Sequence, residues 1–127
     1  MLLSQGMKGS SMKRYLGQKK LMRIYLDNSD THEGKPLWQL LLRKVKEEGL
    51  AGATVFKGAA GIGVRTELHT FEIWSMAQTL PIVIEIIEAE EKIRDFLDKY
   101  DSMIGEGLVT MCDVEVLRYK DASQSRE

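Results

Sequence analysis

The sequence contains only one cysteine, Cys112, among its 127 residues. A single cysteine allows no disulfide within the chain and no zinc cluster built from cysteines. A chain that uses no disulfides is typical of a reducing compartment, so we expect a cytoplasmic protein. A lone cysteine in an apolar stretch is most often a small buried residue, and we expect this one to be buried in a strand.

The sequence also lacks an excess of charge of either sign and has no long hydrophobic run. Its 18 basic and 19 acidic residues give a net charge of −1, so no overall positive field attracts nucleic acid or an anionic membrane. A membrane-spanning helix needs about 20 apolar residues. The best candidate, Leu80–Ile87, is short and contains Glu85. We therefore expect neither nucleic-acid binding nor insertion into a membrane.

The two ends of the chain lack the hydrophobic patterns that predict helices or strands. Residues 1–18 are rich in Gly, Ser and Lys and lack the long apolar centre of a secretion signal. Residues 121–127 are polar. We expect a flexible N-terminal lead over 1–18, one domain over 19–120 and a flexible tail over 121–127. The 43% of hydrophobic residues is enough for one core.

The first half of the domain predicts a strand, a helix and a short strand. Side chains alternate between apolar and polar over Leu21–Leu26, which indicates a half-buried strand. The polar stretch Asp27–Lys35 predicts a loop, and a helix is expected to start near Pro36 and stop at Gly49. Its apolar stripe comprises Leu37, Trp38, Leu41, Leu42 and Val45. The short run Ala53–Lys57 is rich in strand-forming residues.

The second half predicts a strand, a helix and a last strand. The β-branched run Ile82–Ile87 is apolar on both faces, which favours a central strand. Glu88–Ile104 predicts a helix, with early acidic residues that suit a helix N-terminus. Its apolar residues at helical spacing are Ile93, Phe96, Leu97, Tyr100, Met103 and Ile104. Leu108–Leu117 is the last predicted strand. The stretch Val64–Leu80 has no hydrophobic period and follows several glycines, so we expect it to be the most mobile internal segment.

This order of elements is β-α-β-β-α-β, the ferredoxin-like α+β sandwich. Two helices would cover one face of a four-stranded antiparallel sheet and leave the other face open. We expect the open face to be too apolar to remain in water, and so to pack against other copies of the chain. The residues expected on it are Tyr25, Val83, Ile87, Val109, Met111 and Leu117.

Two glycine-bearing segments are candidates for binding phosphate. In Lys57–Arg65, three glycines follow a strand, and glycine lets backbone N–H groups approach a phosphate closely. No helical pattern follows, so the segment is neither a Walker loop nor a Rossmann fingerprint, and a flexible hairpin rim is the alternative. The second segment, Ile104–Gly107, joins a helix to a strand, and a plain helix cap is the alternative there.

No residue set in the sequence predicts catalysis or a metal site. His32 and His69 lie in the two long loops, and the second has Glu67 and Glu72 nearby. Their spacing matches no recognised metal site, so solvated loop residues are the simpler interpretation. No histidine can be paired with a nucleophile, which gives an enzyme hypothesis no catalytic residue to name.

Several segments together resemble a known family. They read GKPLWQLLLRKVKEEGLAGATVFKGAAGIG, LHT, LPIVIEIIEAEEKI, MIGEGLVTM and VEVLRY. In combination they resemble the PII-like proteins of the family catalogued as domain of unknown function 190. The resemblance covers about residues 20–119 and implies a ferredoxin-like protomer in a homotrimer whose sheets face inward.

The resemblance also implies that an adenine nucleotide, ADP or ATP, binds in clefts between protomers. PII signalling proteins begin their long T-loop with a Gly-aromatic-Gly segment, which Gly61-Ile62-Gly63 resembles. Their Ile-Gly-Asp-Gly turn helps to hold phosphates, and Ile104–Gly107 resembles it with Glu106 in place of aspartate. The nucleotide-binding residues expected on these grounds are Lys57, Gly58, Gly61, Gly63, Arg65, Gly105, Glu106, Gly107, Arg118 and Lys120.

The chain departs from the PII pattern at three places. PII proteins carry a phosphate-binding lysine just after the second turn, where this chain has Leu108. Arg118 and Lys120 stand where PII proteins have a late pair of arginines. The loop Val64–Leu80 contains no tyrosine, so the tyrosine that PII proteins use for uridylylation has no counterpart.

The leading hypothesis is a non-catalytic, nucleotide-sensing regulator. The nucleotide would order the loop 64–80 and change its grip on a partner, by analogy a membrane transporter or channel. No metal is expected in this hypothesis. One alternative is a metal-linked trimer resembling the divalent-cation tolerance proteins, and another is a small enzyme with its site at the trimer cleft.

Overall fold

A computed structural model describes residues 16–59 and 79–119 of the chain. The predictions made for most of the lead, for most of the loop 64–80 and for the whole tail 121–127 lie outside these residues. The elements in chain order are β1 (Gly17–Asp27), β2 (Thr31–His32), β3 (Lys35–Pro36), α2 (Leu37–Glu47), β4 (Thr54–Lys57), β5 (Pro81–Glu88), α3 (Glu90–Ile104) and β6 (Leu108–Val116).

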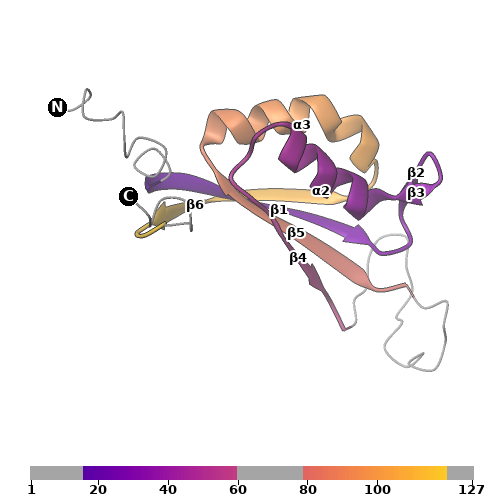
Figure 1. The fold of residues 1–127 in the computed structure, drawn as a ribbon. Coiled ribbons are helices and arrows are strands. Elements are labelled where there is room, and N and C mark those ends of the chain that lie inside the picture. The colour runs from indigo at the N-terminus through magenta and orange to yellow at the C-terminus, as the bar shows by residue number, and fades with distance from the viewer. Residues whose placement is uncertain (1–15, 60–78, 120–127) are drawn as a thin grey trace, which may run out of the picture.

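The main sheet is antiparallel, with the strand order β4-β5-β1-β6. The helices α2 and α3 lie on the same face of it, and no element of residues 16–59 and 79–119 covers the other face (Figure 1). The strand β5 lies inside the sheet between β4 and β1, as its apolar residues on both faces predicted. This is the expected ferredoxin-like arrangement of a two-layer α+β sandwich.

The core lies between the sheet and the helices. Every second residue of β1 and β5 points toward the helices, because successive side chains of a strand alternate between faces. The buried strand residues are Met22, Ile24, Leu26, Ile82, Ile84 and Ile86. The helices contribute Leu37, Leu41, Val45, Ile93, Phe96 and Ile104. The predicted strand phase of β1 and the predicted helical stripes are thus confirmed.

The stretch predicted as a plain loop after β1 contains a small hairpin. Thr31 pairs with Pro36 and His32 pairs with Lys35. Glu33 and Gly34 between them both have positive φ, 53° and 81°. Two successive residues with positive φ form the tight turn that matches the twist of a hairpin. Local pattern did not predict this turn, because Glu rarely takes such a conformation.

The helix α3 starts later than predicted. Glu88 was expected to open the helix, but it is the last residue of β5 and is only 5% exposed. Its carboxylate accepts hydrogen bonds from the N–H groups of Ala51 (2.8 Å) and Ala89 (3.2 Å). The acid therefore joins the loop before β4 to the start of α3, which a pattern of local charges cannot reveal.

The predicted phase of β6 was wrong. Val109 and Met111 were expected on the open face, but they lie opposite Ile24 and Met22, whose side chains point to the helices. Directly opposite residues share a face, so both lie on the covered side and pack against the core. Cys112 falls on the other side and is exposed, not buried as expected.

The strand β1 is longer than predicted. It includes Gly17 and Gln18, which the sequence assigned to the flexible lead, and both pair with β6. The division of the remaining chain into lead, domain and tail stays a prediction.

Candidate functional site

The turn between α3 and β6 contains two glycines, and each is required for a different structural reason. Gly105 follows the helix with φ +65°, a conformation that favours glycine. Gly107 has no room for a side chain, because a Cβ there would lie 2.9 Å from the backbone oxygen of Tyr25 and equally close to Ile104 and Leu26 side-chain atoms. Packing against β1 is therefore sufficient to require glycine at position 107.

The N–H groups of this turn are held only loosely within the chain. Gly105 N–H donates to the oxygen of Asp101 at 3.4 Å, and Gly107 N–H donates to the oxygen of Ile104 at 3.3 Å. Both distances exceed the common 2.9–3.0 Å of backbone hydrogen bonds. The helix-cap interpretation thus accounts for the geometry of the isolated chain, while the long bonds leave the N–H groups weakly satisfied.

The other candidate segment starts at the end of β4. The Gly58 N–H donates to the oxygen of Pro81 at 2.8 Å, and a Cβ at Gly58 would lie 2.6 Å from the Pro81 ring. This glycine is therefore needed for the close approach of β4 to β5. The Lys57 ammonium lies 5.9 Å from the centre of the Trp38 ring, beside the first turn of α2. That places a cation at this end of the sheet.

Asn28 is a residue of this region that the sequence interpretation missed. Its N–H donates to the oxygen of Leu80 at 2.8 Å, and its side-chain oxygen accepts from the Leu80 N–H at 3.0 Å. Together with the Gly58–Pro81 bond, this joins the ends of β1 and β4 to the start of β5 at one end of the sheet. The only sequence signal was an asparagine directly after a strand, where such residues bond to nearby backbone.

The described parts of the two glycine segments lie at the same end of the sheet but on opposite edges. Lys57 lies opposite Ile82, and Leu108 lies opposite Tyr25. The strands β5 and β1 separate the two edges, so Lys57 and Leu108 are about 14 Å apart across three strand spacings.

The remaining predicted residues are farther away or outside the described part. Arg118 follows the opposite end of β6 and is exposed, about 30 Å along the strand from the glycine turn. Gly61, Gly63, Arg65 and Lys120 lie outside the described residues. Glu106 is exposed and is engaged in an interaction, so it is not a free carboxylate.

No metal site is formed by residues 16–59 and 79–119. No group of three or more His, Cys, Asp or Glu side chains in these ranges is placed to hold an ion. His32 lies 3.7 Å from Glu33 across an exposed turn. Within the same ranges, no helix is long and apolar enough to cross a membrane.

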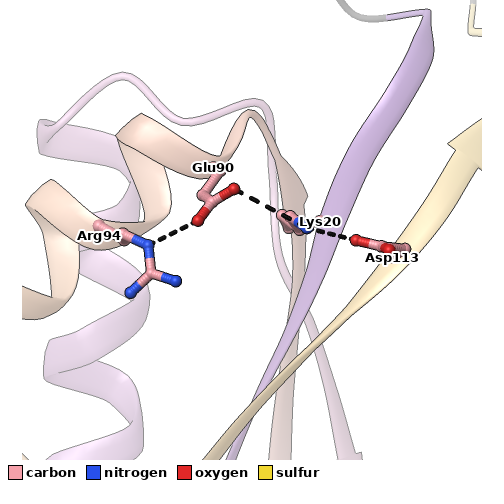
Figure 2. A network of polar contacts seen from close by, with 4 residues as sticks. All are labelled: Lys20, Glu90, Arg94 and Asp113. Atoms are coloured by element: carbon pink, nitrogen blue, oxygen red, sulfur yellow. Dashed lines mark hydrogen bonds and ion pairs between the residues drawn. The ribbon is translucent and has the colours of Figure 1, made fainter.

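The polar network of Figure 2 ties the sheet to the helix layer and lies away from the glycine segments. Lys20 of β1 lies between Asp113 of β6 and Glu90 at the start of α3, and Arg94 donates to Glu90 at 2.7 Å. The hydrogen bond with Asp113 raises the pKa of Lys20, and the one with Arg94 lowers the pKa of Glu90. The Lys20–Asp113 pair joins β1 to β6, whereas the Arg94–Glu90 pair lies within the first turns of α3.

Comparison with known proteins gives the family. A family model described as "Uncharacterized ACR", domain of unknown function 190, matches residues 19–116. The chain belongs to this family. A UPF0166 protein of Aquifex aeolicus is 43% identical over 100 residues, which are 79% of this chain and 94% of the relative. A UPF0166 protein of Methanocaldococcus jannaschii is 36% identical over 100 residues, 78% of this chain and 92% of the relative.

Solved structures confirm that this member of the family has the PII-like fold. CPII of Thiomonas intermedia K12, a nitrogen regulatory PII-like protein bound to ADP, AMP and bicarbonate, matches with a TM-score of 0.57 at 19% identity over 83% of this chain and 99% of CPII. A protein of Thermus thermophilus described as PII-like and signaling has a TM-score of 0.58 at 23% identity, over 80% of this chain and 91% of that protein.

Proposed function

We propose that the protein is a cytoplasmic, non-catalytic PII-like regulator that binds an adenine nucleotide between the protomers of a homotrimer. The observation that carries this proposal is the placement of the two glycine segments. Their described residues lie at one end of the sheet and on its two opposite edges, Lys57 and Gly58 at β4 and Gly105–Gly107 at β6. In a closed ring of copies, the β4 edge of one chain meets the β6 edge of the next, and each junction then joins both segments.

The chemistry at such a junction suits a nucleotide. The β6 edge contributes the loosely held N–H groups of Gly105 and Gly107, and the β4 edge contributes the cation of Lys57. Backbone N–H groups and a nearby cation are what a polyphosphate requires. The description of CPII as bound to ADP and AMP supports adenine nucleotides as the first ligands to try.

The proposed output is control of a partner protein. Lys57 and Gly58, two of the residues proposed to bind nucleotide, lie beside the Gly58–Pro81 and Asn28–Leu80 bonds, which flank the segment 60–78 in the sequence. A bound nucleotide at this place would favour one arrangement of that segment over others, and so change which partner surface it fits. By analogy with other PII-like regulators, the partner is a membrane transporter or channel.

Calorimetric titration with ATP, ADP, AMP and cyclic AMP, each with and without Mg²⁺, tests the binding step. The informative variant is Leu108→Lys, which places a cation directly after the glycine turn at a side chain that is 58% exposed. Because Leu108 also lies opposite Tyr25 on the open face, the variant is titrated only after its mass in solution is shown to equal that of wild type. We expect it to tighten nucleotide binding about tenfold, since a charge-assisted hydrogen bond contributes roughly 1.5–3 kcal/mol.

Leu117→Lys is the matched control, because Leu117 is 82% exposed beyond the opposite end of β6. It makes the same change of charge far from the turn, and nucleotide affinity should stay within about twofold of wild type. Lys57→Ala should weaken binding. No heat with any nucleotide, or equal tightening by both lysine variants, would contradict the proposed site.

A further inference from the structure

The central part of the open face of the sheet consists of three rows that run across the strands. Strand register places directly opposite residues side by side on the same face. The outer row at one end is Ile87–Leu21–Cys112, the middle row is Thr54–Glu85–Arg23–Thr110, and the outer row at the other end is Phe56–Val83–Tyr25–Leu108. A polar middle row is thus flanked by two apolar rows.

An ion pair occupies the centre of the middle row. Arg23 Nε donates to Glu85 Oε2 at 3.1 Å, between the two inner strands β1 and β5. The Arg23 side chain is 40% exposed and that of Glu85 is 24% exposed. Any partner that covers the apolar rows must also cover this pair, since it lies between them.

A second copy of the chain is the occupant that this face fits. The row contains one positive and one negative side chain, so the centre of the face is neutral and complementary to itself. A nucleic acid or an anionic membrane would need a positive face. Another copy carries the same sequence of apolar, polar and apolar rows, and the helices cover only the opposite side of the sheet (Figure 1).

The spacing of the rows determines the register of such packing. Neighbouring rows are two residues apart along each strand, or about 7 Å. In one register, apolar rows meet apolar rows and the ion pairs meet one another. Sliding one copy by a single row would place Arg23 and Glu85 of that copy against apolar side chains, which is costly because charges would be desolvated without partners.

We propose that Arg23 and Glu85 set the register in which copies of this chain pack through their sheets. This inference rests on the proposed homotrimer and adds the residues that specify it. Buried polar groups often contribute little to the stability of an assembly and select one arrangement among several. We therefore expect the intact pair to determine which arrangement of copies forms, and to contribute little to the dissociation constant of the assembly.

The test compares the mass distribution of variants of the full chain with that of wild type by sedimentation velocity over a range of concentrations. Arg23→Met leaves Glu85 without its partner inside the interface, and we expect the dissociation constant of the assembly to rise on the order of 100-fold. Arg23→Met combined with Glu85→Met should assemble as tightly as wild type, but as a mixture of masses because the register is no longer specified.

The exchange of the two charges, Arg23→Glu with Glu85→Arg, should restore one trimeric species. That result would show that both positions can be substituted without loss of the fold. Arg94→Met is the control, because Arg94 makes a similar pair with Glu90 on the helix side, and it should leave the mass unchanged. If the wild type is a trimer and the double methionine variant is also a single trimeric species, the register proposal is wrong, while the proposed trimer stands. A wild-type monomer would overturn the proposed trimer as well.

Discussion

Glu48, at the end of α2, is a carboxylate that joins the two helices. It accepts hydrogen bonds from the Lys99 ammonium (2.8 Å) and the Tyr100 hydroxyl (2.6 Å), both on α3. The hydrogen bond to Glu48 is the main cause that raises the pKa of Tyr100 to about 12, and burial adds to it. The bond from Lys99 is the main cause that lowers the pKa of Glu48.

This contact predicts a measurable titration. A phenol whose pKa is raised by folding stabilises the fold at pH values below its ordinary 10.0 and loses that contribution as the pH rises toward 12. Ultraviolet titration should show one of the four tyrosines ionising near 12, and Tyr100→Phe should remove that step. Glu48→Gln should move it back toward the ordinary value. An unchanged midpoint in Glu48→Gln would contradict the assignment.

Glu88 makes a second prediction at the scale of single residues. Its carboxylate satisfies the N–H groups of Ala51 and Ala89 in a buried position. Glu88→Ala removes both acceptors, and we expect the free energy of unfolding to fall by about 1–3 kcal/mol, measured by urea denaturation. Glu91→Ala, at an exposed position in the first turn of α3, is the control. A loss no greater than that of the control would show that water replaces the carboxylate.

At the scale of the elements, the helix α3 packs into the core through the aromatic side chain of Phe96. Phe96 is 1% exposed, and its ring centre lies 4.9 Å from that of Tyr100. Phe96→Ala should lower the free energy of unfolding by about 3–5 kcal/mol, since it opens a cavity in the core. Asp98→Ala, at an exposed position of the same helix, should have little effect in the same denaturation experiment. A Phe96→Ala loss under about 1 kcal/mol would contradict the packing described for α3.

The buried face of an element could be predicted where the sequence has one clear hydrophobic period, and not where apolar residues occupy both phases. The strand β1 and both helices follow such periods, and their buried residues match the predicted faces. The strand β6 has apolar residues in both phases, with Val109 and Met111 in one and Val114 and Val116 in the other. Only its pairing with β1 decides the face, and a pairing across the chain cannot be read from local alternation.

In the candidate site, the sequence showed where the glycines are, but it could not show which contacts require glycine at those positions. Gly58 is required by Pro81 and Gly107 by the backbone of Tyr25, both distant in sequence. The bond between Asn28 and Leu80 spans 52 residues. Such contacts depend on the completed sheet, so motif matching alone could not separate structural glycines from binding ones.

For the molecule as a whole, the main unexplained surface is the open face of the sheet, which no described helix covers. Tyr25, Val83 and Ile87 lie on it by strand register, as expected, and Leu21 lies there in place of the wrongly predicted β6 residues. An uncovered apolar face of this kind is unusual for a chain that remains monomeric. Both proposals require that copies of the chain associate, the register pair through this face and the nucleotide site at its β4 and β6 edges.

Native mass spectrometry of the full chain with ADP tests this account most directly, because one spectrum reports both the number of chains and the number of bound nucleotides. We expect a species of three times the 14.4 kDa chain mass that carries up to three ADP molecules, and no nucleotide on residual monomer. A monomer that retains ADP, or a trimer that takes up no adenine nucleotide at any concentration tested, would contradict a site formed between protomers.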